Sequence, residues 1–343
     1  MAMFNKFDII VQHRAGHDHQ KMIQVKLRSD KHRKMPIIIH NTDDLEYQVP
    51  KSNPLHDIWY ASGKDKMSLY QLKHSDLCIT TTNKLASNFK YHNKNTYIFK
   101  NTFDWNLPQW NLSQEWLEEK HKEGKVVIGW AGLTSHMKDL EKMMPILKWV
   151  HDKYPNTHFI LAGMPYKNTM NQIQVDPQTG QKSYKEVPVT DERMTYKYRV
   201  KELYGSFDPT RIEFLDVLSL AEYGKFYSMF DIGVAYIEDT KFNHSKSAIK
   251  VNEYMAYNSI PLFSYVGGYK ELYDSLPENL KDINYAIMMN NNEFQWKRKF
   301  ETILDNIELY KDKAKELKEW NKTEYDIFKQ ADEYATFFDS LIK

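Results

Sequence analysis

The fold is decided by residues 231–264, which read DIGVAYIEDTKFNHSKSAIKVNEYMAYNSIPLFS. The segment opens with the apolar run Asp231–Ala235, continues through a polar loop and a helical pattern, and ends in the apolar run Ile260–Ser264. Two short apolar runs joined through a helix are typical of parallel strands with a right-handed crossover. The segment therefore predicts a βαβ unit and an α/β fold.

Short apolar runs alternate with helical patterns on both sides of this unit. Further strands are expected at Asp8–Val11, Pro36–His40, Leu77–Thr80, Thr96–Phe99, Val126–Ala131, His158–Ala162, Arg211–Leu215 and Tyr285–Met289. Helices are expected at Asp18–Lys34, Asp65–His74 and Asn83–Phe89, and along the face formed by Leu140, Met143, Met144, Leu147 and Val150, with Pro145 near the start of that helix. The alternation predicts two doubly wound, Rossmann-like domains with a cleft between them.

The composition of the chain sets the expected domain boundaries. Residues 104–124 are polar and rich in Trp, which predicts a linker with a short helix between an N-terminal domain at 1–103 and a C-terminal domain at 125–310. The polar stretch 165–195 interrupts the second domain as a hairpin, a mobile loop or plain surface decoration. The charged residues 311–343 are expected to form a helical tail.

Composition and charge exclude several classes of protein. Of the 343 residues, 41% are hydrophobic, so the chain can bury real cores and is not a disordered protein. Lys and Arg number 47 against 46 Asp and Glu, so no global basic field indicates nucleic acid or an anionic membrane. The single cysteine, Cys78, excludes a disulfide framework and a thiolate zinc site. Without a membrane-length apolar run or a signal peptide at Met1–Arg14, a cytoplasmic protein with no stable membrane insertion is expected.

A small-residue turn follows the strand expected at Val126–Ala131. Residues 129–139 read GWAGLTSHMKD, so a strand ends in glycines just before a helix begins. Backbone N–H groups and the helix dipole at such a turn can bind a phosphate. Neither the Gly-x-Gly-x-x-Gly pattern nor the Gly-Lys-Ser/Thr pattern is present, so purely structural punctuation remains equally open.

The helix within the deciding segment carries two lysines and a glutamate. Ser245 or Ser247 is expected to cap it, with Lys246 in the first turn, and Lys250 and Glu253 then project from the same face. A cation near a helix N-terminus opposes the dipole unless an anion lies between the lysines. The carboxylate deeper in the helix can accept hydrogen bonds from a ribose diol. A solvated Lys/Glu face is the alternative reading.

These motifs resemble those of GT-B glycosyltransferases, the retaining enzymes that use nucleotide sugars. The Gly-Trp-Ala-Gly turn at Gly129–Leu140 and the Phe-Asn-x-x-Lys-Ser-x-x-Lys…Glu-Tyr segment at Phe242–Tyr254 are similar to a branch common in phages and bacteria. The resemblance spans about 280 residues and fits the first half more loosely. It implies two Rossmann-like domains, an abbreviated N-terminal domain and a C-terminal helix.

Carried over by position, the resemblance implies roles for individual residues. Lys246, Ser247 and Lys250 would bind the donor diphosphate, and Glu253 would hold the ribose hydroxyls. His40 would face the sugar across the cleft, which makes His40, Lys246 and Glu253 the candidate catalytic residues. The remaining candidates lie on the donor side at Gly132, Thr134, His136 and Asn243, and on the acceptor side at Arg14, Asp43 and Asp44.

The sequence also departs from the family pattern. These enzymes often carry two glutamates eight residues apart, and Glu253 fills the second position while Ser245 occupies the first. Leu133 stands where an arginine usually follows the glycine turn. These departures bear on the acceptor more than on donor binding.

No metal or cofactor is expected besides the nucleotide-sugar co-substrate. Asp43 and Asp44 suggest a Mg²⁺ site, but two adjacent aspartates alone are weak evidence for one. A role as a helix cap or in a polar wall of the cleft fits them better. His13, His17 and His19 have no further ligand at a spacing suited to zinc.

The leading hypothesis is a retaining glycosyltransferase that uses a UDP- or GDP-sugar and an acceptor glycan, lipid-linked or other hydroxyl. A second is a phage enzyme, acting in the host cytoplasm, that glycosylates hydroxymethylated pyrimidines in DNA. The local excess of positive charge in residues 1–36, with eight Lys and Arg against three Asp, supports this second hypothesis. A third is a non-catalytic protein that binds nucleotide sugars. The oligomeric state stays open.

Overall fold

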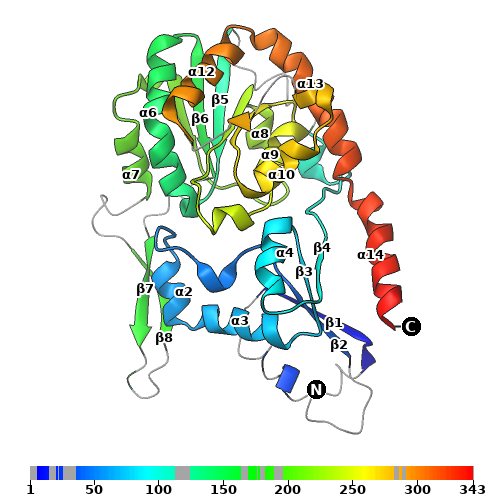
Figure 1. Ribbon diagram of the computed structural model, residues 1–343. Coiled ribbons are helices and arrows are strands. Elements are labelled where there is room, and N and C mark those ends of the chain that lie inside the picture. The colour runs from blue at the N-terminus through cyan, green and yellow to red at the C-terminus, as the bar shows by residue number, and fades with distance from the viewer. Residues whose placement is uncertain are drawn as a thin grey trace.

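The computed structural model describes residues 6–14, 21, 23–25, 36–112, 124–163, 169–175, 177, 182–188, 196–281, 286–287 and 291–342. Two parallel sheets, each accompanied by helices, form two α/β layers stacked one above the other (Figure 1). The α/β prediction with parallel sheets is confirmed. The helices expected within 18–34 and 104–124 lie largely outside the described residues.

The first sheet has four parallel strands in the order β1-β2-β3-β4, with bounds Ile9–His13, Ile37–Asn41, Leu77–Thr80 and Thr96–Ile98. Its helices are η2 (Glu46–Gln48), α2 (His56–Ala61), α3 (Lys64–His74) and α4 (Asn83–Lys90). The side chain of Thr82 accepts a hydrogen bond from the backbone N–H of Leu85 at 3.1 Å, so a local N-cap starts α4. The helix then buries Leu85 and Phe89 against this domain's core.

The second sheet has six parallel strands in the order β12-β11-β10-β5-β6-β9. Their bounds, in chain order from β5, are Val126–Ala131, Thr157–Ala162, Ile212–Leu215, Ile232–Ala235, Ile260–Ser264 and Ala286–Ile287. All residues of β5 are buried, as expected for a central strand covered on both faces. The chain moves outward from β5 through β6 to β9 and then returns to β10 on the opposite side. Ligands of such sheets bind at the carboxyl ends of the strands beside this reversal.

Helices of the second domain surround this sheet. They are η4 (Thr134–His136), α6 (Met137–Lys153), α7 (Tyr196–Leu203), η6 (Pro209–Arg211), α8 (Gly224–Ser228), η7 (Asn243–Ser245), α9 (Ile249–Ala256), α10 (Gly267–Ser275), α11 (Glu278–Lys281), α12 (Glu293–Leu304) and α13 (Ile307–Glu324). A Cβ atom on Gly233 of β10 would lie 2.3 Å from the Tyr254 ring. Glycine therefore lets α9, the helix of the deciding segment, pack directly on the sheet.

Two local features clarify the sequence reading. The stretch 165–195 contains an antiparallel hairpin of β7 (Thr169–Val175) and β8 (Lys182–Pro188), which confirms the hairpin alternative. The expectation that Pro145 lies near the start of its helix is wrong, because α6 already begins at Met137. Pro145 is exposed inside α6, so the carbonyl group that loses its partner can bind water.

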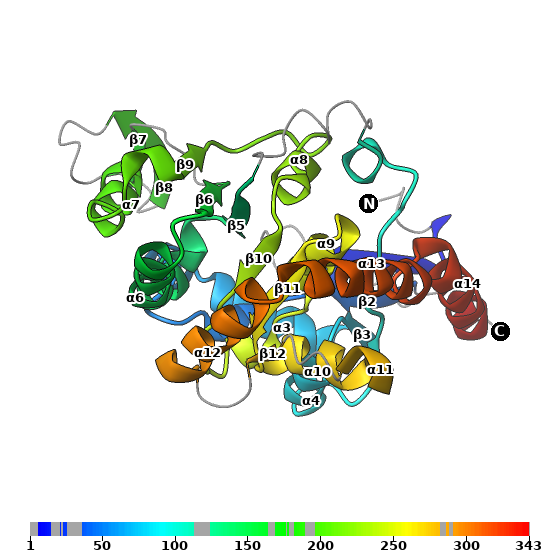
Figure 2. The ribbon, with the colours of Figure 1, turned by 90° about the horizontal axis from the view of Figure 1, so that it is seen from above.

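The C-terminal helices connect the two domains. Seen from above, α12, α13 and α14 (Ile327–Ile342) follow one another across the molecule (Figure 2). Helix α14 returns to the first sheet, where the Tyr334 ring stacks on Phe99 at 4.0 Å and Phe337 meets the same ring edge-on at 5.3 Å. The linker contributes η3 (Pro108–Trp110), which packs on α8. Among the described helices, none has both the length and the apolar character that a bilayer crossing requires.

Candidate functional site

The motif residues meet beside the carboxyl ends of β5 and β10, but the helix starts later than expected. Helix α9 begins at Ile249, and its N-cap residue Ala248 makes no side-chain cap bond. Lys246 lies before the helix in extended backbone, with φ −73° and ψ 146°. The expected Ser245 or Ser247 cap is therefore wrong. Both serine hydroxyls are instead bonded to the first domain.

Lys250 lies in the first turn of α9 and points toward the glycine turn after β5. Its ammonium group lies 5.1 Å from the centre of the Trp130 ring. A Cβ atom on Gly132 would lie 3.1 Å from the Lys250 Nζ and 2.7 Å from the Trp130 ring. Gly132 therefore leaves the room that the Lys250 side chain uses. Burial lowers the Lys250 pKa to about 8, against the raising effect of Asp139.

Lys246 brings a second cation to the same place. Its Nζ lies 5.3 Å from the centre of the Phe242 ring. Burial lowers the Lys246 pKa, whereas Asp44 and Asp139 raise it. Among the described residues, neither Lys246 nor Lys250 forms an ion pair with a carboxylate. Two partly buried ammonium groups that form no ion pair among these residues would be stabilised by an anion between them.

His136 and Asp139 form a hydrogen-bonded pair next to the lysines. His136 Nδ1 lies 2.9 Å from Asp139 Oδ2, and Asp139 Oδ1 accepts from the Glu238 backbone N–H at 3.1 Å. Burial and the charges of Lys250 and Lys246 lower the His136 pKa well below its ordinary value. Both effects favour the neutral ring, and an ionised Asp139 favours the tautomer that carries its proton on Nδ1. In that tautomer Nε2 can accept a hydrogen bond.

Glu253 is buried one turn beyond Lys250 on the same helix face. Its carboxylate accepts hydrogen bonds from the Tyr227 hydroxyl at 2.6 Å and the Tyr223 hydroxyl at 3.2 Å. Burial raises the Glu253 pKa to about 7, although both tyrosine bonds and Lys250 oppose the shift. A mostly apolar cavity of about 310 Å³ adjoins these tyrosines and is lined by residues including Gly132, Gly163 and Leu218.

The three residues predicted on the acceptor side, Arg14, Asp43 and Asp44, also come together. Arg14 Nη2 lies 2.6 Å from Asp43 Oδ1 and 3.1 Å from Asp44 Oδ2. Burial raises the Asp44 pKa, Asp43 raises it further, and Lys246 and Arg14 oppose the shift. Asp44 thus interacts electrostatically with Lys246 across the two domains. The described residues contain no group of three or more His, Cys, Asp or Glu side chains suited to a metal ion.

Three other candidates occupy different environments. His40 has 0% exposure within the first sheet, with its ring 6.5 Å from that of Phe89, and burial lowers its pKa to about 4. Contact with a sugar would require this ring to be uncovered, so that role stays a prediction. Asn243 is buried and donates from Nδ2 to the Glu238 backbone oxygen at 3.0 Å. The side chain of Thr134 lies outside the described part of the chain.

Sequence reasoning missed several residues of the site. Tyr223 is the N-cap residue of α8 and Tyr227 lies four residues further on within the helix, but nothing local in the sequence links them to Glu253. Asp139 was visible in the glycine-turn motif and was not assigned a role. The Gly267-Gly268 pair at the start of α10 is a sequence signal for a close backbone approach.

The two shifted pKa values predict the pH dependence of the site. The predicted anion contact requires protonated Lys250, which is favoured below about pH 8, and the predicted diol contact requires ionised Glu253, which is favoured above about pH 7. We therefore expect kcat/KM to be bell-shaped, with its maximum between these values, because the profile reports groups of the free enzyme. Initial rates with saturating acceptor across this range measure it, and a flat profile would exclude at least one of the two groups.

Comparisons with known proteins support the fold. No protein-family model and no curated protein sequence matches the chain. Among solved structures, HepE from Anabaena, in complex with UDP-glucose, matches with a TM-score of 0.68 and 11% identity over 99% of this chain and 80% of HepE. Sucrose-phosphate synthase from Thermosynechococcus elongatus matches with a TM-score of 0.66 and 13% identity over 98% and 74%.

A glycosyltransferase from Rickettsia africae matches over 100% of this chain and 79% of its own, with a TM-score of 0.64 and 13% identity. At such identities the similarity concerns the fold. The two parallel-sheet domains of this chain have the GT-B glycosyltransferase fold, as the sequence motifs predicted.

Proposed function

We propose that the protein is a retaining glycosyltransferase that transfers a sugar from a UDP- or GDP-sugar to an acceptor hydroxyl. The observation that carries the proposal is the pair of partly buried ammonium groups of Lys246 and Lys250, which lack carboxylate partners among the described residues. They lie at the strand reversal of a GT-B fold, the edge where α/β sheets bind ligands. HepE, which shares the fold, binds UDP-glucose.

The two lysines act on the leaving group. In the transfer, the bond between the anomeric carbon and the diphosphate oxygen breaks, and negative charge grows on the diphosphate. Fixed cations in a partly desolvated site stabilise that charge without reorganising. Lys246 and Lys250 are already held by packing on Phe242 and Trp130, so little further ordering is required. Retention of the anomeric configuration rests on the motif resemblance, and the anomer of the product tests it.

The nucleoside part would occupy the cavity beside Glu253. Glu253 is held by Tyr223 and Tyr227, and a ribose diol would donate to its carboxylate. The 310 Å³ cavity is lined mainly by apolar groups, including Leu218 and Tyr223, which suits a nucleobase face. The acceptor would approach from the first domain, where Arg14 orders Asp43 and Asp44.

A panel of nucleoside diphosphates and nucleotide sugars tests the function. We expect one base to raise the melting temperature selectively, because a ligand at about 100 times its Kd adds about 2.7 kcal/mol of stability. The protein should also slowly release the free nucleoside diphosphate from one particular nucleotide sugar. Stabilisation without any release would favour a non-catalytic binding protein, and no stabilisation by any of these ligands would refute the proposal.

A DNA acceptor remains the second proposal, supported by the eight Lys and Arg residues within 1–36. Most of that stretch lies outside the described residues. Incubation with the cognate donor and hydroxymethylated DNA separates it from a glycan acceptor, because only the DNA proposal predicts sugar on the base.

Transfer is expected to survive EDTA. Lys246 and Lys250 supply the positive charge that a divalent ion would otherwise bring to the diphosphate. Rates with the cognate donor should agree in EDTA and in excess Mg²⁺. Complete loss in EDTA, restored by Mn²⁺ or Mg²⁺, would contradict this expectation and revive Asp43 and Asp44 as ligands of a phosphate-bound ion.

A further inference from the structure

The segment that carries Lys246 belongs to the second domain but packs on the first domain and is hydrogen-bonded to it. Phe242, at its start, is buried in the core of the first domain together with Leu45, Leu85 and Phe89. Helix α4 of the first domain also packs against η7, the short helix directly before Lys246. The approach of the chain to Lys246 is therefore set by both domains.

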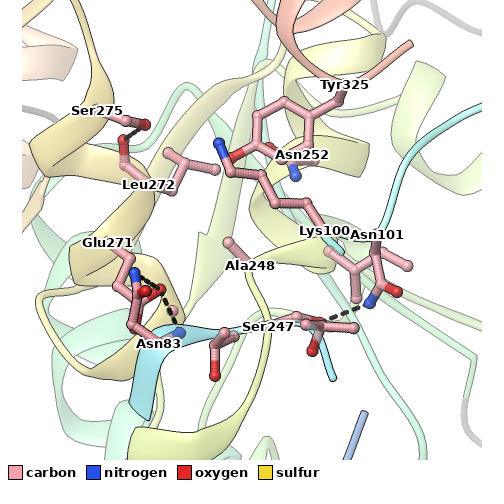
Figure 3. Close-up of a pocket in the computed structure, with 14 residues that line it drawn as sticks. Asn83, Lys100, Asn101, Ser247, Ala248, Asn252, Glu271, Leu272, Ser275 and Tyr325 are labelled. Carbon is pink, nitrogen blue, oxygen red and sulfur yellow. Dashed lines mark hydrogen bonds between the residues drawn. The ribbon is translucent and has the colours of Figure 1, made fainter. Parts of the chain in front are cut away.

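Both neighbours of Lys246 are hydrogen-bonded to first-domain side chains. Asn88 Nδ2 donates to Ser245 Oγ at 3.0 Å, and Asn101 Nδ2 donates to Ser247 Oγ at 2.9 Å (Figure 3 shows the second bond). The Thr82 hydroxyl donates to the Ser245 backbone oxygen at 3.3 Å. Ser245 has 0% exposure, and its hydroxyl and backbone oxygen both serve the contact between the domains.

Helix α10 also contacts the Lys246 segment and the first domain. The Gly268 backbone N–H donates to the Lys246 backbone oxygen at 3.1 Å, and a Cβ atom on Gly268 would lie 2.3 Å from that oxygen. Further along α10, the Glu271 carboxylate accepts from the Asn83 backbone N–H and Nδ2, both at 3.1 Å (Figure 3). It also accepts from the Lys84 backbone N–H at 3.2 Å. These are N–H groups at the start of α4, where a carboxylate also complements the helix dipole.

We propose that Asn88, Asn101 and Glu271 are positioning residues for Lys246, so that docking of the first domain sets the affinity of the second domain for the donor diphosphate. The inference rests on the proposed function. The segment has no regular structure of its own between η7 and α9, so its backbone would lose conformational freedom on binding an anion. The contacts from α4, Asn101 and α10 fix that backbone before the ligand arrives, which reduces the ordering cost of binding.

Two asparagine variants and a matched control test the inference. Asn88→Ala and Asn101→Ala should each weaken binding of UDP or GDP, whichever the protein prefers, about three- to tenfold by titration calorimetry, with a larger loss in the double variant. The control is Asn93→Ala. Asn93 Nδ2 donates to the backbone oxygens of Leu72 and Ser75 within the first domain. Asn93→Ala should therefore lower the melting temperature while leaving the Kd for the nucleoside diphosphate unchanged.

A double-mutant cycle separates positioning from general destabilisation. Once Ser245→Ala has removed the shared bond, adding Asn88→Ala should cause little further loss of affinity. Glu271→Gln keeps the size of the side chain and should weaken binding about two- to threefold, which gives a readout if the alanine variants fold poorly. In each case the KM for the donor should rise more than kcat falls.

The outcomes distinguish this inference from the proposed function. If the wild-type protein binds nucleoside diphosphates and the Asn88, Asn101 and Glu271 variants bind them equally well, the positioning role is refuted and the proposed function stands. If the wild-type protein binds no nucleoside diphosphate, both are refuted.

Discussion

Replacing Lys250 by methionine should weaken nucleoside diphosphate binding by about 10- to 150-fold while leaving the melting temperature unchanged or higher. A charge-assisted hydrogen bond contributes about 1.5–3 kcal/mol, which corresponds to this range. Lys250 packs between Trp130 and the open side of Gly132, and burial already lowers its pKa to about 8. Methionine fills similar space without a charge, so the free protein loses an unfavourable group and the complex loses a favourable one.

Titration calorimetry and thermal melting of the same samples measure both effects. Lys142→Met provides the control, because Lys142 is an exposed lysine of α6. Normal nucleotide binding by Lys250→Met, together with a lower melting temperature, would show that the lysine is structural.

The start of α9 determines which of the two lysines should have the larger effect on binding. Had α9 started with Lys246, that side chain would have opposed the helix dipole most directly. Because the helix starts at Ile249, Lys250 lies in its first turn and Lys246 lies in extended backbone before it. Lys246→Met should therefore weaken binding in the same direction but less than Lys250→Met. Its effect should also depend on Asn88 and Asn101, which fix the neighbouring serines.

The strands could be predicted closely because their signal is local. Leu77–Thr80, Val126–Ala131 and Ile260–Ser264 begin and end where the apolar runs do, since each strand is buried along its whole length. Strand order and the strand reversal beside β5 required the structure. Parallel neighbours can be far apart in the sequence, as β5 and β10 are.

The start of α9 could not be predicted because its cause is distant. Ser245 and Ser247 are good N-cap residues by local rules, but their hydroxyls are bonded to Asn88 and Asn101, which lie 157 and 146 residues away in the sequence. Tertiary hydrogen bonds therefore overrode the local preference. Lys246, Lys250 and Glu253 could be grouped as candidates because their motif is contiguous. Tyr223 and Tyr227 could not, because they lie earlier in the chain, at the start of α8 and within it.

Replacing Glu253 by glutamine should lower kcat/KM with the cognate donor at least tenfold and remove the acid limb of the pH profile. Loss of charge-assisted hydrogen bonds to a ribose diol costs about 1.5–3 kcal/mol in transition-state binding. Glutamine keeps one carbonyl oxygen for Tyr227 or Tyr223, so the local packing is preserved. Tyr227→Phe, which removes one donor to the carboxylate, serves as the comparison and should have a smaller effect on rate.

Stability gives an independent readout of Glu253. Its pKa in the folded protein is raised from 4.5 to about 7, so the folded state binds more protons than the unfolded state between these values. Wild-type stability should therefore fall as pH rises through this window, because ionisation of the buried carboxyl is disfavoured in the folded state. Glu253→Gln has no such group and should lose less stability over the same range. A variant with wild-type kcat/KM and a wild-type pH dependence of melting would remove Glu253 from the site, and the ribose would have to be bound elsewhere.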